Sequence, residues 1–540
     1  MRERNKSSTM ASLTSTNNVP LIKQTSLQSI DDNNDAQLEP MEPCSQCINT
    51  SVLSLTIVAI ACSEVPFDEK KITDMVRDDL LRVNPCFSSI VVRDKMGRQW
   101  WKRVEVRMED HIVIPSFPPG LTPEEYTNHF DEYLAKINHD ELSMDKPLWE
   151  LHLVKYPTRE GEGTLVFKMH HALGDGFSIM GAVFSCLKRA DDPSLPLTFP
   201  CASASNARQQ SDERNVLGKV VRFIDGGWNS VTGFLMSFLR STVLEDDRTV
   251  IRSRKPRVED LPCDIASVTF SMDDIKRVKS NLNVRRIWIV ISRISPLTFM
   301  SHTVNDIVVG TIFYGTELYT KALNPSSNHL RRTALVLLNT RMLKGYRNLE
   351  EMLEKDLWGN SFSFIHLPLP SVRADKEKID PLKFIFRAHR TIKRSKNSLG
   401  THLNGSLLQL VGRLKGIEVC HLFVLTTSLL IFMTLKNMMN SDMFQAMSRY
   451  IYSTLENTSM AISNMVGPTE KMNIAGHPIN NLYFTVTGSP QSLLFTVLSY
   501  MGKLRIVVKS ERGFIDSQNF TSCLKEAFKK ICEAADKADK

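Results

Sequence analysis

The chain has 540 residues, and 67 Lys+Arg against 59 Asp+Glu give it a formal net charge of +8. A chain of this length exceeds the size at which one hydrophobic core keeps growing, so two packed halves are expected. The positive charge is spread along the chain without an arginine-rich arm or an RNP-like aromatic strand, so nucleic acid is not an expected partner. The ten cysteines are scattered and no secretory signal is recognisable, which indicates reduced thiols facing the cytosol. Cys44 and Cys47 form the one CxxC pair, with no second pair and no nearby histidine to complete a metal site.

Residues 1 to 38 are rich in Ser, Thr, Asn and Asp, and we expect a disordered leader. Because this segment contains few acidic residues at its start, a transit peptide is the alternative. Residues 39 to 200 then alternate between β-rich runs, at 52–62, 149–156 and 164–171, and helical spacing, at 68–85 and 177–190. Asp68 is the expected cap of the first helix and Pro85 its stop.

Residues 201 to 265 are expected to form a connector that crosses the surface. The connector contains an apolar stretch at 228–239 and a basic run from Arg252 to Arg257, a combination suited to lying in the plane of a membrane surface. Strand and helix patterns resume after it. The sequence therefore predicts an α/β (α+β) fold with an N-terminal half at 39–200 and a C-terminal half at 266–540, packed into one body because an isolated half would expose an apolar sheet face.

The segment with the clearest chemical pattern is FKMHHALGDGFSIM, residues 167 to 180. Side chains on a strand alternate between its faces, so His170 and His171 are expected to point in opposite directions and cannot share a metal ion. Gly174 and Gly176 flank Asp175, which permits a sharp turn that returns the carboxylate toward His171 or its backbone. A histidine, with an ordinary pKa of about 6.5, suits a general base at neutral pH. The simpler interpretation is a core histidine beside a tight turn.

Other known catalytic motifs are missing from the sequence. The segment after Asp175 looks like a nucleophile elbow, but G-x-S-x-G requires glycine where Met180 stands, so Ser178 is a poor nucleophile candidate. No P-loop, G-x-G-x-x-G or H-E-x-x-H is present, which leaves nucleotide, dinucleotide and zinc-protease chemistry without support. We expect no metal ion and no cofactor.

The HHxxxDG pattern at 170–176 resembles the active-site motif of the acyl-coenzyme A dependent acyltransferases related to chloramphenicol acetyltransferase and the peptide-synthetase condensation domains. Within that superfamily, the chain is most similar to the plant wax ester synthase/diacylglycerol acyltransferases. Supporting stretches run in the family's order across about residues 75 to 540: NPCFSS (84–89), PLWELHLV (147–154), TVNDIVVG (303–310), LWGNSFSF (357–364), SNMVGP (463–468) and the segment 476–508.

This resemblance implies two chloramphenicol acetyltransferase-like halves, each a β-sheet flanked by helices, with a substrate tunnel between them. It implies that His171 takes the hydroxyl proton of a long-chain alcohol or diacylglycerol, whose oxygen attacks the thioester of acyl-coenzyme A without a covalent enzyme intermediate. Acyl-coenzyme A is then a substrate rather than a cofactor. The implied catalytic set comprises His170, His171, Asp175 and Gly176. Asp175 has a structural role in it, paired with Arg341 of the other half; a solvated strand-end charge is the alternative for Arg341.

Eight further residues match family motifs near the tunnel, and the resemblance implies substrate contacts for Pro147, Leu148, Trp149, Asn305, Asp306, Asn464, Gly467 and Pro468. Each also has a simpler interpretation. A buried tryptophan at a strand start is as often plain core, and Asn, Gly and Pro in short loops usually serve turns.

Three segments depart from the family pattern. Residues 285–302 and 419–440 are apparent insertions in the C-terminal half, and residues 39–51 lack the helix that the family usually has there. Within the second insertion, Val419 to Leu435 is uncharged but shorter than the roughly 20 residues of a spanning helix. We therefore expect a buried segment, with a membrane span as the alternative.

Three functions are compatible with the sequence. The leading one is O-acylation of a long-chain fatty alcohol or diacylglycerol by acyl-coenzyme A, at the cytosolic side of the endoplasmic reticulum or plasma membrane or at a lipid-droplet surface. The second is a soluble acyltransferase of specialised metabolites, but the DFGWG motif of those enzymes is echoed only by DGGW at 225–228, far too early in the chain. The third is a non-catalytic lipid-binding protein, suggested by the insertions.

Overall fold

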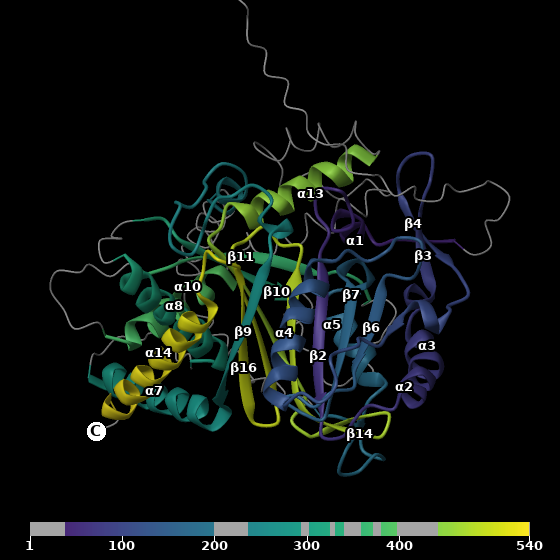
Figure 1. Cartoon of the computed structure of the whole chain (residues 1–540). Coiled ribbons are helices and arrows are strands. Elements are labelled where there is room, and N and C mark those ends of the chain that lie inside the picture. The colour runs from purple at the N-terminus through teal and green to yellow at the C-terminus, as the bar shows by residue number, and fades with distance from the viewer. Residues whose placement is uncertain are drawn as a thin grey trace, which may run out of the picture.

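The structure is a computed structural model, and it describes residues 38–198, 236–292, 302–324, 330–339, 358–370, 380–396 and 441–538. Two mixed sheets lie side by side, each with helices packed against it (Figure 1). The predicted α/β fold, in which two sheet-and-helix halves form one body, is confirmed.

The first sheet has seven strands. At its centre is β2, antiparallel to β7 on one side and to β14 on the other. Alternate residues of β2 and β7 belong to two different apolar clusters, so both faces of this sheet are covered. In spatial order the strands are β5 (Ile112–Val113), β6 (Trp149–Val154), β7 (Gly163–His170), β2 (Thr56–Ser63), β14 (His477–Thr487), β13 (Met472–Ile474) and β8 (Lys188–Arg189).

Helices cover both faces of the first sheet. One face packs against α4 (Pro123–His139), and the other against α5 (Gly176–Ser185) and the helical segment formed by α2 (Glu69–Met75), the π-helical turn η2 (Val76–Leu80) and α3 (Leu81–Val83). As predicted, Asp68 caps α2, because its carboxylate accepts a hydrogen bond from the Lys71 amide at 3.2 Å. Pro85 follows the end of α3 and opens the 3₁₀ turn η3 (Pro85–Ser88). A smaller sheet of β1 (Leu38–Pro40), β4 (Gln99–Arg103) and β3 (Ser89–Arg93) lies beside this half.

The helix predicted at 177–190 is shorter in the structure. It ends at Ser185, and Lys188–Arg189 pairs as β8 with β13, a strand almost three hundred residues further along the chain. The prediction was wrong at this end because helical spacing reports local sequence, whereas the pairing is a long-range contact.

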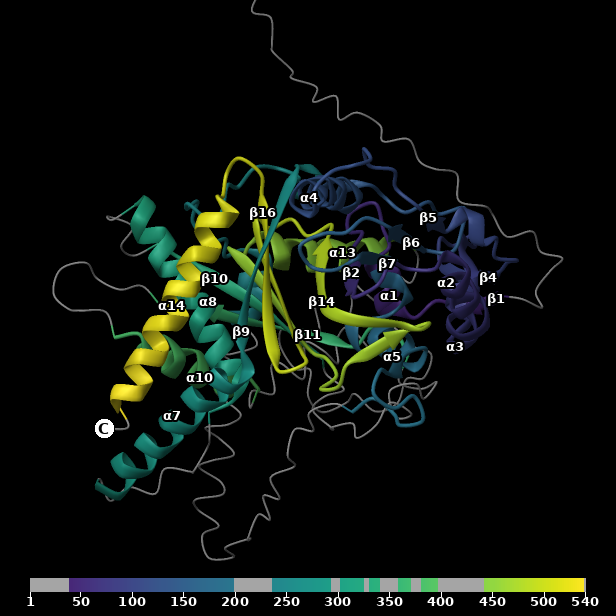
Figure 2. The ribbon, with the colours of Figure 1, turned by 60° about the horizontal axis from the view of Figure 1, so that its bottom comes forward.

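The second sheet has six strands and also carries helices on both faces. Among the described helices, one face packs against α7 (Met272–Ser292), α8 (Val304–Leu323), α10 (Leu382–Lys396) and α14 (Ser517–Ala538) (Figure 2). The other face packs against α13 (Ser441–Glu456) and against the N-terminal helix α1 (Pro43–Cys47). The strands, in spatial order, are β11 (Phe362–Pro368), β10 (Thr333–Asn339), β12 (Met460–Val466), β15 (Leu493–Tyr500), β16 (Lys503–Glu511) and β9 (Cys263–Ser271).

Helix α1 corrects the expectation that residues 39–51 lack a helix. Glu42 is the N-cap of this helix, because its carboxylate accepts hydrogen bonds from the amides of Cys44 (3.1 Å) and Ser45 (2.9 Å). Pro43 occupies the first turn, where proline is favoured. Although α1 is only five residues long, it is buried against α13 and strands of the second sheet. Packing between the two halves therefore stabilises a helix that the local sequence does not predict.

A strand exchange joins the halves. β13 and β14 come from the C-terminal part of the chain but belong to the first sheet, where β14 pairs with β2 along its length. The next strand, β15, returns to the second sheet. A second link between the halves is an ion pair. The guanidinium of Arg505 on β16 donates to both carboxylate oxygens of Glu160 in the first half, at 2.5 and 2.6 Å. The same guanidinium lies 3.8 Å from the centre of the Tyr483 ring.

The described end of the connector runs over the surface and is anchored at a few buried residues. The Asp246 carboxylate accepts hydrogen bonds from the amides and hydroxyls of Thr333 and Ser459, and so ties the connector to the starts of β10 and β12. Arg252 is 4% exposed and binds Glu245.

The remaining cations of the basic run are also paired: Arg254 with Glu245, Lys255 with Glu511, and Arg257 with Asp260. The run therefore has less free positive charge for a membrane than its sequence suggests. Most of the apolar stretch at 228–239 lies outside the described residues, and 236–242 is helical.

The two apparent insertions are described only in part. Helix α7 continues through Ser292, so the first insertion begins as an extension of that helix; 293–301 and the whole second insertion lie outside the described residues. Among the helices that the structure describes, none has both the length and the apolar character needed to cross a bilayer.

The strand exchange predicts that the N-terminal half does not fold alone. In a fragment of residues 1–260, β2 would lose its neighbour β14 and expose a long, apolar strand edge. We expect this fragment to aggregate or to lack a cooperative thermal transition, as measured by size-exclusion chromatography and circular dichroism. A monomeric fragment that melts at the temperature of the full chain would contradict the prediction that the N-terminal half does not fold alone.

Candidate active site

The HHxxxDG motif forms the turn between β7 and α5. The strand ends at His170, His171 begins a 3₁₀ turn, η5 (His171–Leu173), and Asp175 is the N-cap of α5. Strand alternation therefore stops one residue before His171. The alternation on which the expected opposite directions rested does not reach His171, but the two imidazoles have different hydrogen-bond partners.

His170 is fixed by hydrogen bonds at both ring nitrogens. Its Nδ1 accepts from the amide of Ala172 at 3.0 Å, and its Nε2 lies 3.0 Å from the hydroxyl of Ser54. Burial lowers the pKa of His170 to about 3, so the ring is neutral and carries its proton on Nε2. With both nitrogens occupied, His170 holds the turn in place and has no lone pair to offer a substrate.

His171 is bound through one ring nitrogen. Its Nδ1 lies 2.9 Å from Oδ1 of Asn360, which precedes β11 of the second half. The Nδ2 group of Asn360 donates to the carbonyl of His171 at 2.9 Å and to the hydroxyl of Ser45 at 2.8 Å. Both side chains are buried, with His171 7% and Asn360 3% exposed.

The orientation of Asn360 determines the tautomer of His171. Because Nδ2 of Asn360 donates to the His171 carbonyl, the amide lies with its oxygen toward Nδ1 of His171. An amide oxygen can only accept, so His171 must carry its proton on Nδ1. Within the described residues, Nε2 of His171 makes no hydrogen bond. The arrangement leaves a basic lone pair on a fixed imidazole, which is the requirement for a general base.

Asp175 clamps the motif turn to the second half. One carboxylate oxygen accepts from the amide of Ser178 and the other from the amide of Ser361, both at 3.0 Å. The Asp175 amide donates to the carbonyl of Gly359 at 3.1 Å. The scaffolding role expected for Asp175 fits these contacts. Its predicted partner, Arg341, lies outside the described residues, so that pairing stays a prediction.

Gly176 allows β12 to approach the motif. A Cβ atom at position 176 would lie 2.8 Å from the sulfur of Met465. Next to Met465, Asn464 donates through Nδ2 to Oδ1 of Asn305 at 2.9 Å, so two predicted residues from separate motifs meet here. Gly467 donates to the Ser499 carbonyl, and Pro468 is buried beside it.

Pro147, Leu148 and Trp149 belong to the core of the first half. Trp149 is fully buried, stacks on His111 with ring centroids 4.1 Å apart, and donates its indole N–H to the Phe87 carbonyl at 2.9 Å. The Leu148 carbonyl accepts from the amide of His170 at 2.9 Å. These contacts correspond to the core alternative, and through Leu148 they position the motif.

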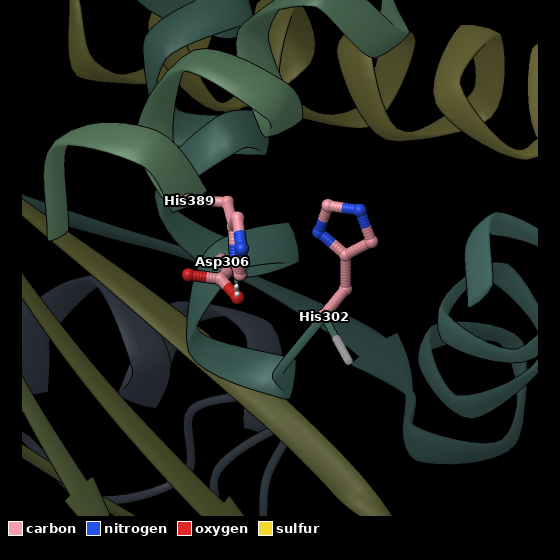
Figure 3. Close-up of side chains that lie close together, drawn as sticks. All are labelled: His302, Asp306 and His389. Atoms are coloured by element: carbon pink, nitrogen blue, oxygen red, sulfur yellow. Dashed lines mark hydrogen bonds and ion pairs between the residues drawn. The ribbon is translucent and has the colours of Figure 1, made fainter. Parts of the chain in front are cut away.

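Asp306 completes the capping box of α8 with the N-cap residue Thr303 and lies beside two histidines, His302 and His389 (Figure 3). Its Oδ2 accepts from the amide of Thr303 (2.7 Å), the hydroxyl of Thr303 (2.9 Å) and Nδ1 of His389 (2.9 Å). Burial alone would raise the pKa of Asp306, but the hydrogen bonds from His389 and Thr303 outweigh it and lower the pKa. Ligand atoms of the three residues lie within 4.8 Å of one another, a spacing that could hold a metal ion. The cap at the start of α8 accounts for the position of Asp306 without one.

The CxxC pair lies in α1. Cys44 and Cys47 are both buried, and burial raises the pKa of Cys47, so this thiol stays protonated and unreactive.

Sequence reasoning missed Asn360 and the segment around it. The stretch LWGNSFSF was noted as a family match, but no residue in it was assigned a role. Trp358 donates its indole N–H to the Leu173 carbonyl at 3.0 Å, and Gly359 and Ser361 bind the Asp175 turn. A polar asparagine directly before an apolar strand was the available signal.

Two family models match the chain. The wax ester synthase/diacylglycerol acyltransferase catalytic domain matches residues 52–285, and the WS/DGAT C-terminal domain matches residues 358–532. Among similar proteins, wax ester synthase/diacylglycerol acyltransferase 11 of Arabidopsis thaliana is 26% identical, with 91% of this chain and 94% of the relative covered. Wax ester synthase/diacylglycerol acyltransferase 4 of the same plant is 27% identical, with 87% and 85% covered.

Solved structures share the fold. A wax ester synthase/diacylglycerol acyltransferase from Marinobacter aquaeolei VT8 superimposes with a TM-score of 0.52 at 13% identity, covering 92% of this chain and all of the other. The first condensation domain of the calcium-dependent antibiotic synthetase gives a TM-score of 0.50 at 12% identity, covering 93% and 97%.

Replacing Asp175 by Asn tests its role as a clamp. An asparagine would turn an NH2 group toward one of the two amides that now donate to Asp175, so a buried donor would lose its acceptor. We expect a loss of about 1 to 3 kcal/mol in the free energy of unfolding, measured by chemical denaturation. Unchanged stability together with lost catalysis would assign Asp175 a direct chemical role instead.

Proposed function

Because the chain belongs to the wax ester synthase/diacylglycerol acyltransferase family and is an acyltransferase, we propose that it esterifies a long-chain fatty alcohol or diacylglycerol with the acyl group of acyl-coenzyme A. The observation that supports this most directly is the buried imidazole of His171, oriented by Asn360 so that Nε2 faces no protein donor among the described residues.

In the proposed reaction, Nε2 of His171 accepts the hydroxyl proton as the alcohol oxygen attacks the thioester carbonyl. The tetrahedral intermediate collapses, the carbon–sulfur bond breaks, and the imidazolium returns the proton to the coenzyme A sulfur. No covalent enzyme intermediate is needed, because binding both substrates between the halves makes the attack effectively intramolecular. During this cycle, the Nδ1–H of His171 stays bonded to Asn360.

The environment of His171 keeps the base neutral. Burial lowers the pKa of His171, while the charge of Asp175 and the hydrogen bond to Asn360 act in the opposite direction. Activity requires the unprotonated ring, so it should fall as the pH drops through this lowered pKa. We expect the acid limb of kcat/KM below the ordinary histidine pKa of about 6.5.

The proposal includes the predicted partners and location. The substrates are acyl-coenzyme A and a hydrophobic alcohol; neither nucleic acid, a metal ion nor a separate cofactor takes part. Because the acceptors partition into lipid, we propose that the enzyme works at the cytosolic side of the endoplasmic reticulum or plasma membrane, or at a lipid-droplet surface. Fractionation of cells that express a tagged full-length chain would test this location.

The experiment that tests the function is coenzyme A release by the purified full-length protein. Palmitoyl-coenzyme A is supplied with hexadecanol, with diacylglycerol, or with neither, and ester products are identified by mass spectrometry. Acceptor-dependent release supports the proposal. Release that requires a small soluble alcohol instead would favour a specialised-metabolite enzyme, and binding without release would favour a lipid-binding protein.

The adjacent histidines provide a matched pair of variants. We expect His171→Ala to lower kcat by about 10² to 10⁴ while acyl-coenzyme A binding is nearly unchanged, because a general base is lost. His170→Ala removes the bonds to Ser54 and Ala172, so its main effect should be on thermal stability. Equal losses of kcat in two well-folded variants, or full activity in His171→Ala, would rule out the proposed mechanism.

A further inference from the structure

A continuous chain of hydrogen bonds leads from His171 to a carboxylate. The Nδ1–H of His171 donates to Oδ1 of Asn360 at 2.9 Å, and Nδ2 of Asn360 donates to the hydroxyl of Ser45 at 2.8 Å. The hydroxyl of Ser45 in turn donates to Oε2 of Glu42 at 3.1 Å. The first three side chains are all less than 9% exposed, so water does not replace these bonds.

We propose that Glu42 and Ser45 are positioning residues that set the basicity and the tautomer of His171 through Asn360. This inference rests on the proposed role of His171 as the base. It assigns a function to α1, a helix that contributes no residue to the HHxxxDG motif.

The donors around Glu42 match an ionised carboxylate. Its oxygens accept from the amides of Cys44 (3.1 Å), Ser45 (2.9 Å) and Asn360 (3.4 Å), as well as from the Ser45 hydroxyl. Burial has the largest effect and raises the pKa of Glu42 above its ordinary value, while these four hydrogen bonds to the carboxylate limit the rise. A carboxylate that accepts several backbone N–H bonds is favoured in its charged form.

The negative charge of Glu42 acts on His171 through the polarised amide. An acceptor at Nδ2 draws electron density toward the oxygen of Asn360, and the hydroxyl of Ser45 is a stronger acceptor because it donates to a carboxylate. When His171 takes a proton on Nε2, the positive charge that develops on the ring is stabilised by this oxygen. The chain should therefore raise the basicity of His171 and favour the transition state.

Within the described part of the chain, few other charged or titratable groups act on these residues. The charge of the Asp175 carboxylate acts to raise the pKa of His171, and the charge of His171 acts to lower the pKa of the adjacent His170. Beside Glu42 stands the Cys47 thiol, whose pKa is raised by burial and by Glu42 itself. From β11, the Phe362 ring approaches His171 with centroids 6.2 Å apart and carries no charge.

The test measures the protonation of His171 directly, so it does not depend on activity. Deuterium exchange at the imidazole C2 position is followed against pH in the full-length protein, and peptide fragmentation assigns the exchange to His171 or to the neighbouring His170. Four variants are compared with the native chain: Glu42→Gln, Ser45→Ala, Ser45→Thr and Ser178→Ala. Ser178 is the matched control, because its hydroxyl holds the neighbouring Gly359 but lies outside the chain of hydrogen bonds.

We expect the exchange midpoint of His171 to fall by about half a pH unit to one unit in Glu42→Gln and in Ser45→Ala. Ser45→Thr keeps a hydroxyl at position 45, so its exchange midpoint should lie close to the native value. In the acyl-transfer assay, the first two variants should lower kcat by about 10-fold with little change in KM, because they act on the proposed base through Asn360.

An unchanged midpoint in Ser45→Ala would overturn the proposal even if Glu42→Gln fails to fold. An equal shift in Ser178→Ala would also overturn it, because any loosening of the 358–361 segment would then suffice. Failure of the acyltransferase proposal would give a different result. The native protein would then release no coenzyme A, while the exchange midpoints of His171 would still test the influence of Glu42 and Ser45.

Discussion

The side-chain amide of Asn360 is satisfied only when three distant parts of the chain are together. It binds the ring and carbonyl of His171 from the first half and the hydroxyl of Ser45 from α1, while its own backbone leads into β11 of the second half. Because Asn360 is buried, each bond left unmade would cost about 1 to 3 kcal/mol. The contact that orients the imidazole of His171 is therefore also a condition for the halves to pack correctly.

The strand exchange gives this contact a rigid frame. With β14 paired to β2, the C-terminal part of the chain cannot separate from the N-terminal part without breaking a long antiparallel ladder. The motif turn follows β7, next to β2 in that sheet, and Asn360 stands directly before β11 at an edge of the other. Both partners are thus positioned by strands rather than by free loops, which limits the displacement of the imidazole from its working position.

Local patterns in the sequence predicted the parts of the fold that depend on neighbouring residues. Asp68 caps a helix as its position suggested. The Asp175 carboxylate, expected beside His171 or its backbone, instead accepts hydrogen bonds from the amides of Ser178 and Ser361. Features set by long-range contacts were missed: α1 is stabilised by packing on α13, and Lys188–Arg189 forms a strand because β13 lies beside it. No periodicity in residues 39–51 or 177–190 carries that information.

The site shows the same division. The motif identified His171 and His170 as a pair with opposite surroundings, but the tautomer of His171 depends on Asn360, whose role is visible only once the halves are together. Trp149 had both a core and a substrate interpretation from the sequence, and its fully buried ring with an indole bond to Phe87 fits the core interpretation. Residue types and their spacing can suggest a chemical role. Whether a side chain can fill that role depends on which of its hydrogen-bonding atoms are already used within the fold.

His170 and His171 illustrate that decision. They are neighbours, of one residue type, both buried, and burial lowers the pKa of each. Burial and pKa therefore do not distinguish a structural histidine from a base. The difference is that His170 uses both ring nitrogens within the protein, whereas His171 uses Nδ1 and makes no hydrogen bond through Nε2 among the described residues. A general base needs one lone pair that the fold leaves unoccupied, and the second histidine of the motif is the one that meets this requirement.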